Sequence, residues 1–581
     1  MSTSTEKPSI KKRILPTLLI SIALPFLITI SVPFDIFANN STEFIFNFMD
    51  FFPSLLLFFF ILSTVFFFSV LFLPKKAYRI VCAILIALSV MFFIQGTYLN
   101  INLNSLQGDN MGTDGSPVGA RIFNLILWIV VVAVAITLAC LKDKNGTLST
   151  IGVIATIIVL ATQIMTPLSI VLSNDQVFLP LAERLNGDEE SSSHKIITYK
   201  NVTTASNNKN IYYFCIDRFD EIYAEHAYQQ KPEIFDELTG FTWFQDNISV
   251  YAHTYPAIHN MLTLKDYDSS KSRYDNLKGA YSGNTPLNVL NDNDYNINLY
   301  SDAYYSFLDG SNLPDYIQNT ALPSSSEVTS KLGLAFGMVQ TALYRGMPDY
   351  LKMTINNVNS STCNNFVLEK DQDGNTVFNT ELDLVYNSII NKNFDTTEKN
   401  NFTFLHTSGC HNIGYSRDYN NIEPHSQTIV QTVEKNFEII NKYIKYLKQN
   451  NLYDSATIVI TGDHSHPSND YDPIVKGPRL TALFVKPANS SDAPLKTSHA
   501  QVSHDNIWAT IMQSANISSA NNYGTSVFDI PEGVNQERRY IWHTYSEDFA
   551  ESKYTISGPG ADFANWSLTE TKTYNGRHIT D

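Results

Sequence analysis

Apolar residues crowd the first third of the 581-residue chain. They form five stretches, each near the roughly 20 residues that a helix needs to cross a bilayer, at about 14–33, 52–73, 79–99, 121–141 and 150–172. Ionisable side chains are almost absent from these stretches, which argues against an ion or proton pathway through them. The pattern predicts an integral membrane protein with a five-helix transmembrane anchor over residues 1–174, which either only anchors the chain or also helps to present a lipid substrate.

Basic residues fix the expected orientation of this anchor. If there are five spans, one side of the membrane receives Lys11, Lys12, Arg13, Lys75, Lys76, Arg79, Lys142 and Lys144. The opposite loops, 34–51 and 100–120, contain no Lys or Arg, and Arg121 at the edge of the fourth stretch is the one departure. The positive-inside rule therefore predicts a multi-pass protein of the cell membrane, with a cytoplasmic N-terminus and everything after residue 173 extracytoplasmic.

The pattern changes after the apolar part. Residues 175–207 are expected to form a juxtamembrane linker, with an amphipathic piece at Gln176–Leu185 and a flexible acidic and Ser-rich run at 186–193. From about 208 onward, strand-like runs alternate with helical patterns, which predicts an α/β sheet with helices on both faces. Strands are expected at 211–216, 297–300, 402–406, 457–460 and 479–486, and helices at 428–449 and 503–514. We expect a catalytic domain over 208–530, with 531–581 as its C-terminal extension.

Two of the predicted strands end on carboxylates. The run Ile458–His466 places Asp463 and His464 directly after a β-branched strand, and Ile211–Ile216 runs straight into Asp217. Ligands of open α/β sheets bind at the carboxyl ends of the strands, and a carboxylate with an imidazole is a natural pair of metal ligands. By itself the pair also fits a turn Asp beside a surface His. Two such strands favour carboxylates that converge on one cation.

A candidate nucleophile lies in the segment His253–Thr263. Pro256 suits the first turn of a helix, which places Thr254 at or just before a helix N-terminus, where anions are favoured. A hydroxyl there can lose its proton to a metal and attack phosphorus or sulfur. The alternative is a simple N-cap. The flanking His253 and His259 are left as surface or packing residues.

A further imidazole follows the strand at 402–406. His411 comes at the end of Thr407-Ser-Gly-Cys-His411 and could donate to a non-bridging oxygen or to a leaving group. His406 is the weaker candidate because it sits within the strand.

Bulk composition narrows the function classes. A formal charge of −16 argues against a nucleic-acid partner, but not against an anionic substrate, since a bound metal can reverse the local field. The five cysteines are too few and too scattered for a disulfide framework. Cys363 and Cys410 could pair only in an oxidising compartment, and we predict no structural disulfide.

Taken in chain order, these segments resemble the alkaline phosphatase superfamily. The order is a strand ending at Asp217, Thr254-X-Pro with Met-Leu-Thr, a strand and loop ending at His411, a helix, Thr-Gly-Asp463-His464, Lys-Pro, and Val502-Ser-His504-Asp. Within the superfamily the chain is most similar to the sulfatase-like, membrane-anchored enzymes typified by lipoteichoic acid synthase and the phosphoethanolamine transferases. The resemblance covers roughly 208–530 and the five-span anchor.

The resemblance implies one divalent metal ion, Mn²⁺, Zn²⁺ or Mg²⁺, held by Asp217, Thr254, Asp463 and His464. It also implies that Thr254 is the covalent nucleophile and that His411 contacts the substrate. The chain departs from those enzymes in having Asp217 where Glu is usual, and it lacks the cysteines of the phosphoethanolamine branch. Sulfatases need Cys or Ser at the nucleophile and Arg four residues on, where this chain has Thr254 and Ile258, so phosphoryl chemistry is favoured. His466 and His504 could supply a second metal site.

The expected function is a membrane-anchored, metal-dependent phosphotransferase or phosphodiesterase. Its donor would be a membrane lipid with a phosphodiester headgroup, and its acceptor a cell-envelope glycan or polymer. One alternative is a sulfatase-like hydrolase of a phosphate or sulfate ester. The other is a non-catalytic lipid-binding regulator that keeps the fold, which predicts lost ligands, whereas all four ligand positions are filled here.

Overall fold

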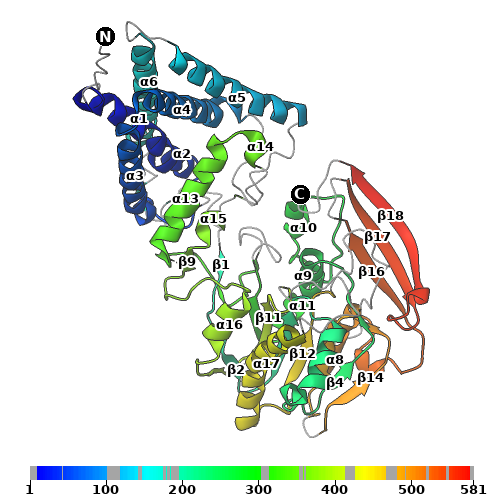
Figure 1. Ribbon diagram of the computed structural model, residues 1–581. Helices are drawn as coiled ribbons and strands as arrows, with labels where there is room; N and C mark the ends of the chain where they lie inside the picture. Colours follow the sequence, from blue (N-terminus) through cyan, green and yellow to red (C-terminus); the bar gives the residue numbers. More distant parts are fainter. Residues whose placement is uncertain are drawn as a thin grey trace, which may run out of the picture. The chain divides into compact units, whose positions relative to one another are not determined.

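The chain divides into two compact units in the computed structural model (Figure 1). The first unit holds residues 1–192 and 323–370, and the second holds 193–322 and 371–581. The structure describes residues 10–41, 44–100, 118–141, 147–173, 178–179, 184, 195–302, 313–352, 358, 361–411, 426–465, 480–490, 493–517, 523–544 and 548–575. The expected loop 100–120, amphipathic piece Gln176–Leu185 and linker 186–193 fall mostly outside these residues, and His466 falls outside them entirely.

Five helices of the first unit are long and apolar enough to cross a membrane, as predicted. They span Ile14–Asn39, Phe48–Leu71, Lys75–Leu99, Val118–Cys140 and Thr147–Ser169. The first consists of α1 (Ile14–Phe26) and α2 (Val32–Asn39), joined by the π-helical turn η2 (Leu27–Ser31). The others are α3 (Phe48–Leu71), α4 (Lys75–Ile94) with the π-helical turn η3 (Gln95–Leu99), α5 (Val118–Cys140) and α6 (Thr147–Ser173). Their orientation in the membrane stays a prediction.

Residues 323–370, from the middle of the chain, pack with these helices in the first unit. They run through β8 (Ser325–Val328), α13 (Lys331–Gly346), α14 (Asp349–Lys352), α15 (Ser361–Asn364) and β9 (Val367–Lys370). Buried residues of α13 share one apolar cluster with α2 and α3. The chain therefore passes between the units three times, at 192/193, 322/323 and 370/371. The domain limits expected from the sequence stay predictions, and they do not include this return.

A seven-stranded sheet forms the core of the second unit. Its order is β14-β4-β13-β12-β3-β11-β6. The strands are β3 (Asn210–Ile216), β4 (Thr242–Phe244), β6 (Tyr295–Tyr300), β11 (Asn400–Thr407), β12 (Thr457–Thr461), β13 (Leu483–Lys486) and β14 (Lys496–Ser498). The four strands from β12 to β6 are parallel, whereas β13 is antiparallel to both of its neighbours. The sheet is thus mixed, with its parallel half carrying the predicted acidic strand ends.

Helices cover both faces of this sheet, which confirms the predicted α/β class. Side chains alternate along a strand, so Tyr212 and Tyr213 of β3 point to opposite faces. Tyr212 contacts Tyr443 of α17 (Ser426–Gln449), and Tyr213 contacts Trp508 of α18 (Ile507–Ser514). On the second face, the Trp508 indole donates to the carbonyl of Met261 in α9 (Thr254–Thr263) at 2.6 Å.

The described C-terminal part is an antiparallel sheet of β16 (Glu537–His543), β17 (Asp548–Ser557) and β18 (Trp566–Asn575). Strand β16 joins the segment before α9, because the Ala252 N–H donates to the Ile541 carbonyl and the Ile541 N–H donates to the Val250 carbonyl. All five cysteines are free thiols.

Candidate metal and nucleophile site

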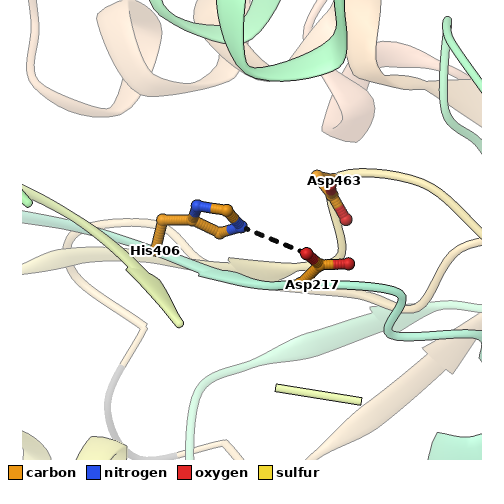
Figure 2. Close-up of side chains that lie close together, drawn as sticks. All are labelled: Asp217, His406 and Asp463. Carbon is orange, nitrogen blue, oxygen red and sulfur yellow. Dashed lines mark ion pairs between the residues drawn. The ribbon is translucent and has the colours of Figure 1, made fainter. Parts of the chain in front are cut away.

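The carboxyl ends of β11, β3 and β12 bring an imidazole and two carboxylates together (Figure 2). In the register of the sheet, His406 and Thr461 both lie opposite Cys215. Paired residues share a face and side chains alternate, so Asp217 and Asp463, each two residues on, share that face with His406. One ligand atom from each of the three lies within 4.8 Å of the others. Nε2 of His406 is 4.0 Å from Oδ2 of Asp217.

The backbone holds Asp463 with one oxygen turned to the site. Oδ1 accepts hydrogen bonds from the N–H groups of Arg218 at 2.9 Å and His464 at 2.8 Å. Oδ2 is buried and has no hydrogen-bond partner among the described residues. A Cβ at Gly462 would lie 2.8 Å from the backbone nitrogen of Phe219, so only glycine allows the two backbone segments to approach this closely. This close approach explains why a glycine stands between Thr461 and Asp463.

Thr254 opens α9, and its hydroxyl lies in the same site. The Thr254 Oγ1 is 3.1 Å from Nε2 of His464. The other ring nitrogen of His464, Nδ1, is 2.7 Å from the Ser465 carbonyl, to which it donates, so Nε2 carries the lone pair. Nε2 can therefore accept the Thr254 proton or ligate a metal. The N-terminus of α9 also favours negative charge on that oxygen.

The carboxylates of the site fit a bound cation. Asp217 and Asp463 are both buried, and Oδ1 of Asp217 also has no hydrogen-bond partner among the described residues. Burial, and then the charge of Asp463, raise the pKa of Asp217 well above its usual range. A divalent cation would offset both effects, and carboxylate, hydroxyl and imidazole ligands suit Mn²⁺, Mg²⁺ or Zn²⁺. The structure thus brings together Asp217, Thr254, Asp463 and His464, and their role as metal ligands stays a prediction.

Three further histidines lie near these four residues. His406, ranked second from the sequence, is buried in the site, and burial lowers its pKa to about 4, so the imidazole is neutral at pH 7. His411 lies in the turn after β11, where its N–H donates to the Ser408 carbonyl at 2.9 Å, and it acts electrostatically on His406. His504 is buried with Nε2 at 3.3 Å from the hydroxyl of Thr461.

The C-terminal sheet supports the nucleophile segment through a buried hydrogen-bonded group. Nε2 of His253, the residue before Thr254, donates to the backbone carbonyl of His543 at 2.9 Å. The His543 ring contacts the Ser269 hydroxyl at 3.2 Å and the Glu551 carboxylate at 3.3 Å. All four side chains are buried. His253 is therefore a packing residue that ties the start of α9 to β16.

Replacing Glu551 with glutamine is expected to destabilise the second unit by about 2–3 kcal/mol at pH 7. Burial alone would raise the pKa of Glu551, but hydrogen bonds from His543 and Ser269 outweigh it and lower the pKa to about 2. The carboxylate thus contributes stability above its ordinary pKa of 4.5. That contribution is lost as the pH falls from about 4.5 to about 2.

Denaturation followed by tryptophan fluorescence measures this effect, since four of the five tryptophans lie in the second unit. The difference between wild type and Glu551→Gln should shrink below pH 4.5. Glu570→Gln, which removes a carboxylate from exposed pairs on β18, serves as the control and should show no comparable loss. Equal stability of wild type and Glu551→Gln at pH 7 would contradict the prediction.

Comparisons with known proteins identify the family of this chain. The family model Sulfatase matches residues 210–517, which is more than half of the chain. The chain is similar to the lipoteichoic acid synthase LtaP of Listeria monocytogenes, with 10% identity, 67% of this chain and 91% of that chain covered, and a TM-score of 0.33. It is also similar to the phosphonate monoester hydrolase SpPMH of Silicibacter pomeroyi, with 13% identity, 64% of this chain and 90% of that chain covered, and a TM-score of 0.33. A third similar structure is a protein in the alkaline phosphatase superfamily from Vibrio parahaemolyticus, with 10% identity, 66% of this chain and 85% of that chain covered, and a TM-score of 0.34. Comparison with curated proteins gives no match.

Proposed function

We propose that this protein is a membrane-anchored, metal-dependent phosphotransferase. The chain belongs to the sulfatase family of the alkaline phosphatase superfamily, and the proposal starts from that membership. The observation that carries the proposal is the position of the Thr254 hydroxyl, 3.1 Å from Nε2 of His464 and beside two buried carboxylates. A threonine at this position retains an oxygen nucleophile, whereas sulfatases need the Cys or Ser that is converted to formylglycine. The metal would be held by Asp217, Thr254, Asp463 and His464.

In the first step, Thr254 Oγ1 attacks the phosphorus of a lipid-linked phosphodiester. A bound divalent cation would supply positive charge that lowers the pKa of this hydroxyl, so that Oγ1 attacks, and is later released, as the alkoxide. The Oγ1–P bond forms while the bond from phosphorus to the lipid alcohol breaks, and His411 donates a proton to the departing oxygen. The products are a free lipid alcohol and a phospho-threonyl enzyme, in which the headgroup phosphate is bonded to Thr254 as a phosphodiester.

In the second step, the hydroxyl of a cell-envelope glycan or polymer attacks the same phosphorus. Its proton returns to His411, and the Oγ1–P bond breaks to regenerate Thr254. The membrane anchor favours a lipid donor, because confinement to the bilayer raises the effective concentration. With the expected positive-inside orientation, the reaction takes place on the extracytoplasmic side.

Removing the metal with a chelator is expected to abolish activity and to lower the stability of the second unit. Metal at 100 times its Kd would stabilise the unit by about 2.7 kcal/mol, and two buried carboxylates would repel without it. Thermal unfolding and turnover of a chromogenic phosphodiester, before and after chelation, measure the two effects. Re-addition of Mn²⁺, Mg²⁺ or Zn²⁺ should restore both. Full activity of the chelated protein would refute the proposal.

The substrate class is tested with the full chain in nanodiscs. The phosphodiester should be turned over, and a matched aryl sulfate should not. With a headgroup-labelled lipid, the label should appear on Thr254 by peptide mass spectrometry and then pass to an added polyol acceptor. Turnover of the sulfate ester alone would favour the sulfatase-like hydrolase instead.

A further inference from the structure

Residues 331–352, which form α13 and α14, expose large apolar side chains on one side and bury charged groups at their C-terminal end. The side chain of Lys352 is fully buried, and that of Asp349 is 15% exposed. By contrast, Leu332 is 58% exposed and Phe336 is 63% exposed. An element that faces water normally buries the apolar residues and exposes the charged ones.

The inward polar groups bond to the ends of the membrane helices. Lys352 Nζ donates to Asn100 at 2.7 Å and to Asp349 at 2.8 Å. The buried Gln95 of η3 donates to the same two oxygens, at 3.0 and 3.1 Å, and accepts from Asn124 of α5 at 2.9 Å. This network neutralises and satisfies the buried ammonium group, which a low-dielectric setting requires.

A second ion pair fixes the end of α13. Arg345 donates to the Asp35 carboxylate of α2 at 2.6 Å and to the Gly96 carbonyl at 3.2 Å. Gly346 allows close contact with the ring of Phe92 in α4. The charged groups of this segment are thus directed toward the helices that are expected to span the bilayer.

The outward side of α13 is apolar along its length. Leu332, Phe336, Val339 and Leu343 follow one another at spacings of four, three and four, which places them on one helix face. The first two are exposed and the last two are partly exposed. In α14 the exposed side chains are again large and apolar or aromatic, namely Tyr350 and Leu351.

We infer that α13 and α14 form a sixth membrane-embedded element, whose outward face contacts lipid acyl chains. At about 1.5 Å per residue, the 16 residues of α13 are too short to cross the bilayer. The element therefore occupies one leaflet. Its polar contacts lie on η3, on the end of α2 and near the start of α5, which are extracytoplasmic ends in the expected orientation. The leaflet is the outer one, and the partner is its lipid.

Spin-label accessibility in lipid nanodiscs tests this inference on the full chain. Cys140 is the one exposed cysteine among the described residues, so a Cys140→Ser background leaves only buried thiols. A nitroxide is attached at Phe336→Cys and, in a second variant, at Leu332→Cys. Phe60→Cys on the spanning helix α3 is the lipid-facing control, and Leu384→Cys on α16 (Leu382–Ile389) of the second unit is the water-facing control.

The labels at 336 and 332 should match the label at 60, with strong relaxation by oxygen and protection from a water-soluble nickel chelate. Relaxation by nickel as strong as at 384 would overturn the inference, because the face would then lie in water. Protection from both agents would also overturn it, because a second copy or another protein would then cover the face. None of the four labelled positions belongs to the proposed catalytic site, so failure of this inference would leave the proposed function untouched.

Discussion

Replacing Thr254 with alanine is expected to lower kcat by roughly 10⁴-fold or more, as loss of a covalent nucleophile does elsewhere. The variant keeps the helix, because Thr254 makes its described contacts through the hydroxyl to His464 and the Asp217 carboxylate. It cannot form the phospho-threonyl intermediate. Single-turnover assays with labelled lipid should therefore show neither a burst of released alcohol nor label on the protein.

Two further variants separate the loss of the nucleophile from disturbance of α9. Thr263→Ala removes a buried hydroxyl from the other end of the same helix, where it donates to the His259 carbonyl at 2.7 Å, and it should retain most activity. Thr254→Ser keeps an oxygen at the reacting position and should retain measurable turnover. Full activity of Thr254→Ala, with Thr263→Ala unaffected, would sink the mechanism.

Replacing Arg538 with methionine is expected to destabilise the second unit by about 3–5 kcal/mol, the cost of leaving a buried charge without its partner. Arg538 is buried and donates to both the carboxylate and the carbonyl of Asp246 at 2.8 Å. It also donates to the Gly558 carbonyl at 2.6 Å. Methionine keeps the apolar stem but leaves the Asp246 carboxylate in a low-dielectric setting.

The neighbouring arginine provides a matched control. Arg539 forms ion pairs with Asp266 and Asp505, all three being more than one-third exposed, so Arg539→Met should cost no more than about 1 kcal/mol. Adding Asp246→Asn to Arg538→Met should recover part of the loss, because the uncompensated charge is removed. Urea unfolding followed by tryptophan fluorescence compares the variants. Equal losses for Arg538→Met and Arg539→Met would contradict the prediction.

Most of the site could be predicted from the sequence because its signals are local. A β-branched strand that stops on Asp463, and an apolar strand that stops on Asp217, each indicate a carboxylate at the end of a parallel strand. Pro256, two residues after Thr254, indicates the first turn of a helix. Each pattern needs only about ten residues of context, and the rule that ligands bind at strand ends joins them.

The place of His406 could not be predicted in the same way. Its side chain reaches the site only because β11 pairs with β3 in the register that sets His406 opposite Cys215. A shift of one residue would turn the imidazole to the other face. Strands buried on both faces have no alternation of polar and apolar residues from which that register could be read.

The return of residues 323–370 to the membrane helices was also not predicted. The apolar run in α13 is shorter than a span, so a hydropathy search passes over it. Its partners are far away in sequence, as in the pairs Arg345–Asp35 and Lys352–Asn100. Only the folded structure shows that these polar residues turn away from solvent.

Because the chain passes between the units three times, a single proteolytic cut cannot separate the second unit from the first. Near these passages β1 (Ile196–Ile197) pairs with β7 (Thr320–Ala321), and the Phe378 N–H donates to the Ile197 carbonyl. A protease that nicks one passage leaves the other two intact, so release of the second unit takes three cuts. A soluble fragment made by deleting the first 192 residues would still carry α13, stripped of its packing partners and prone to aggregate. Joining residue 322 directly to residue 371 removes that helix and keeps both segments that hydrogen-bond to β1, namely β7 and the segment that contains Phe378.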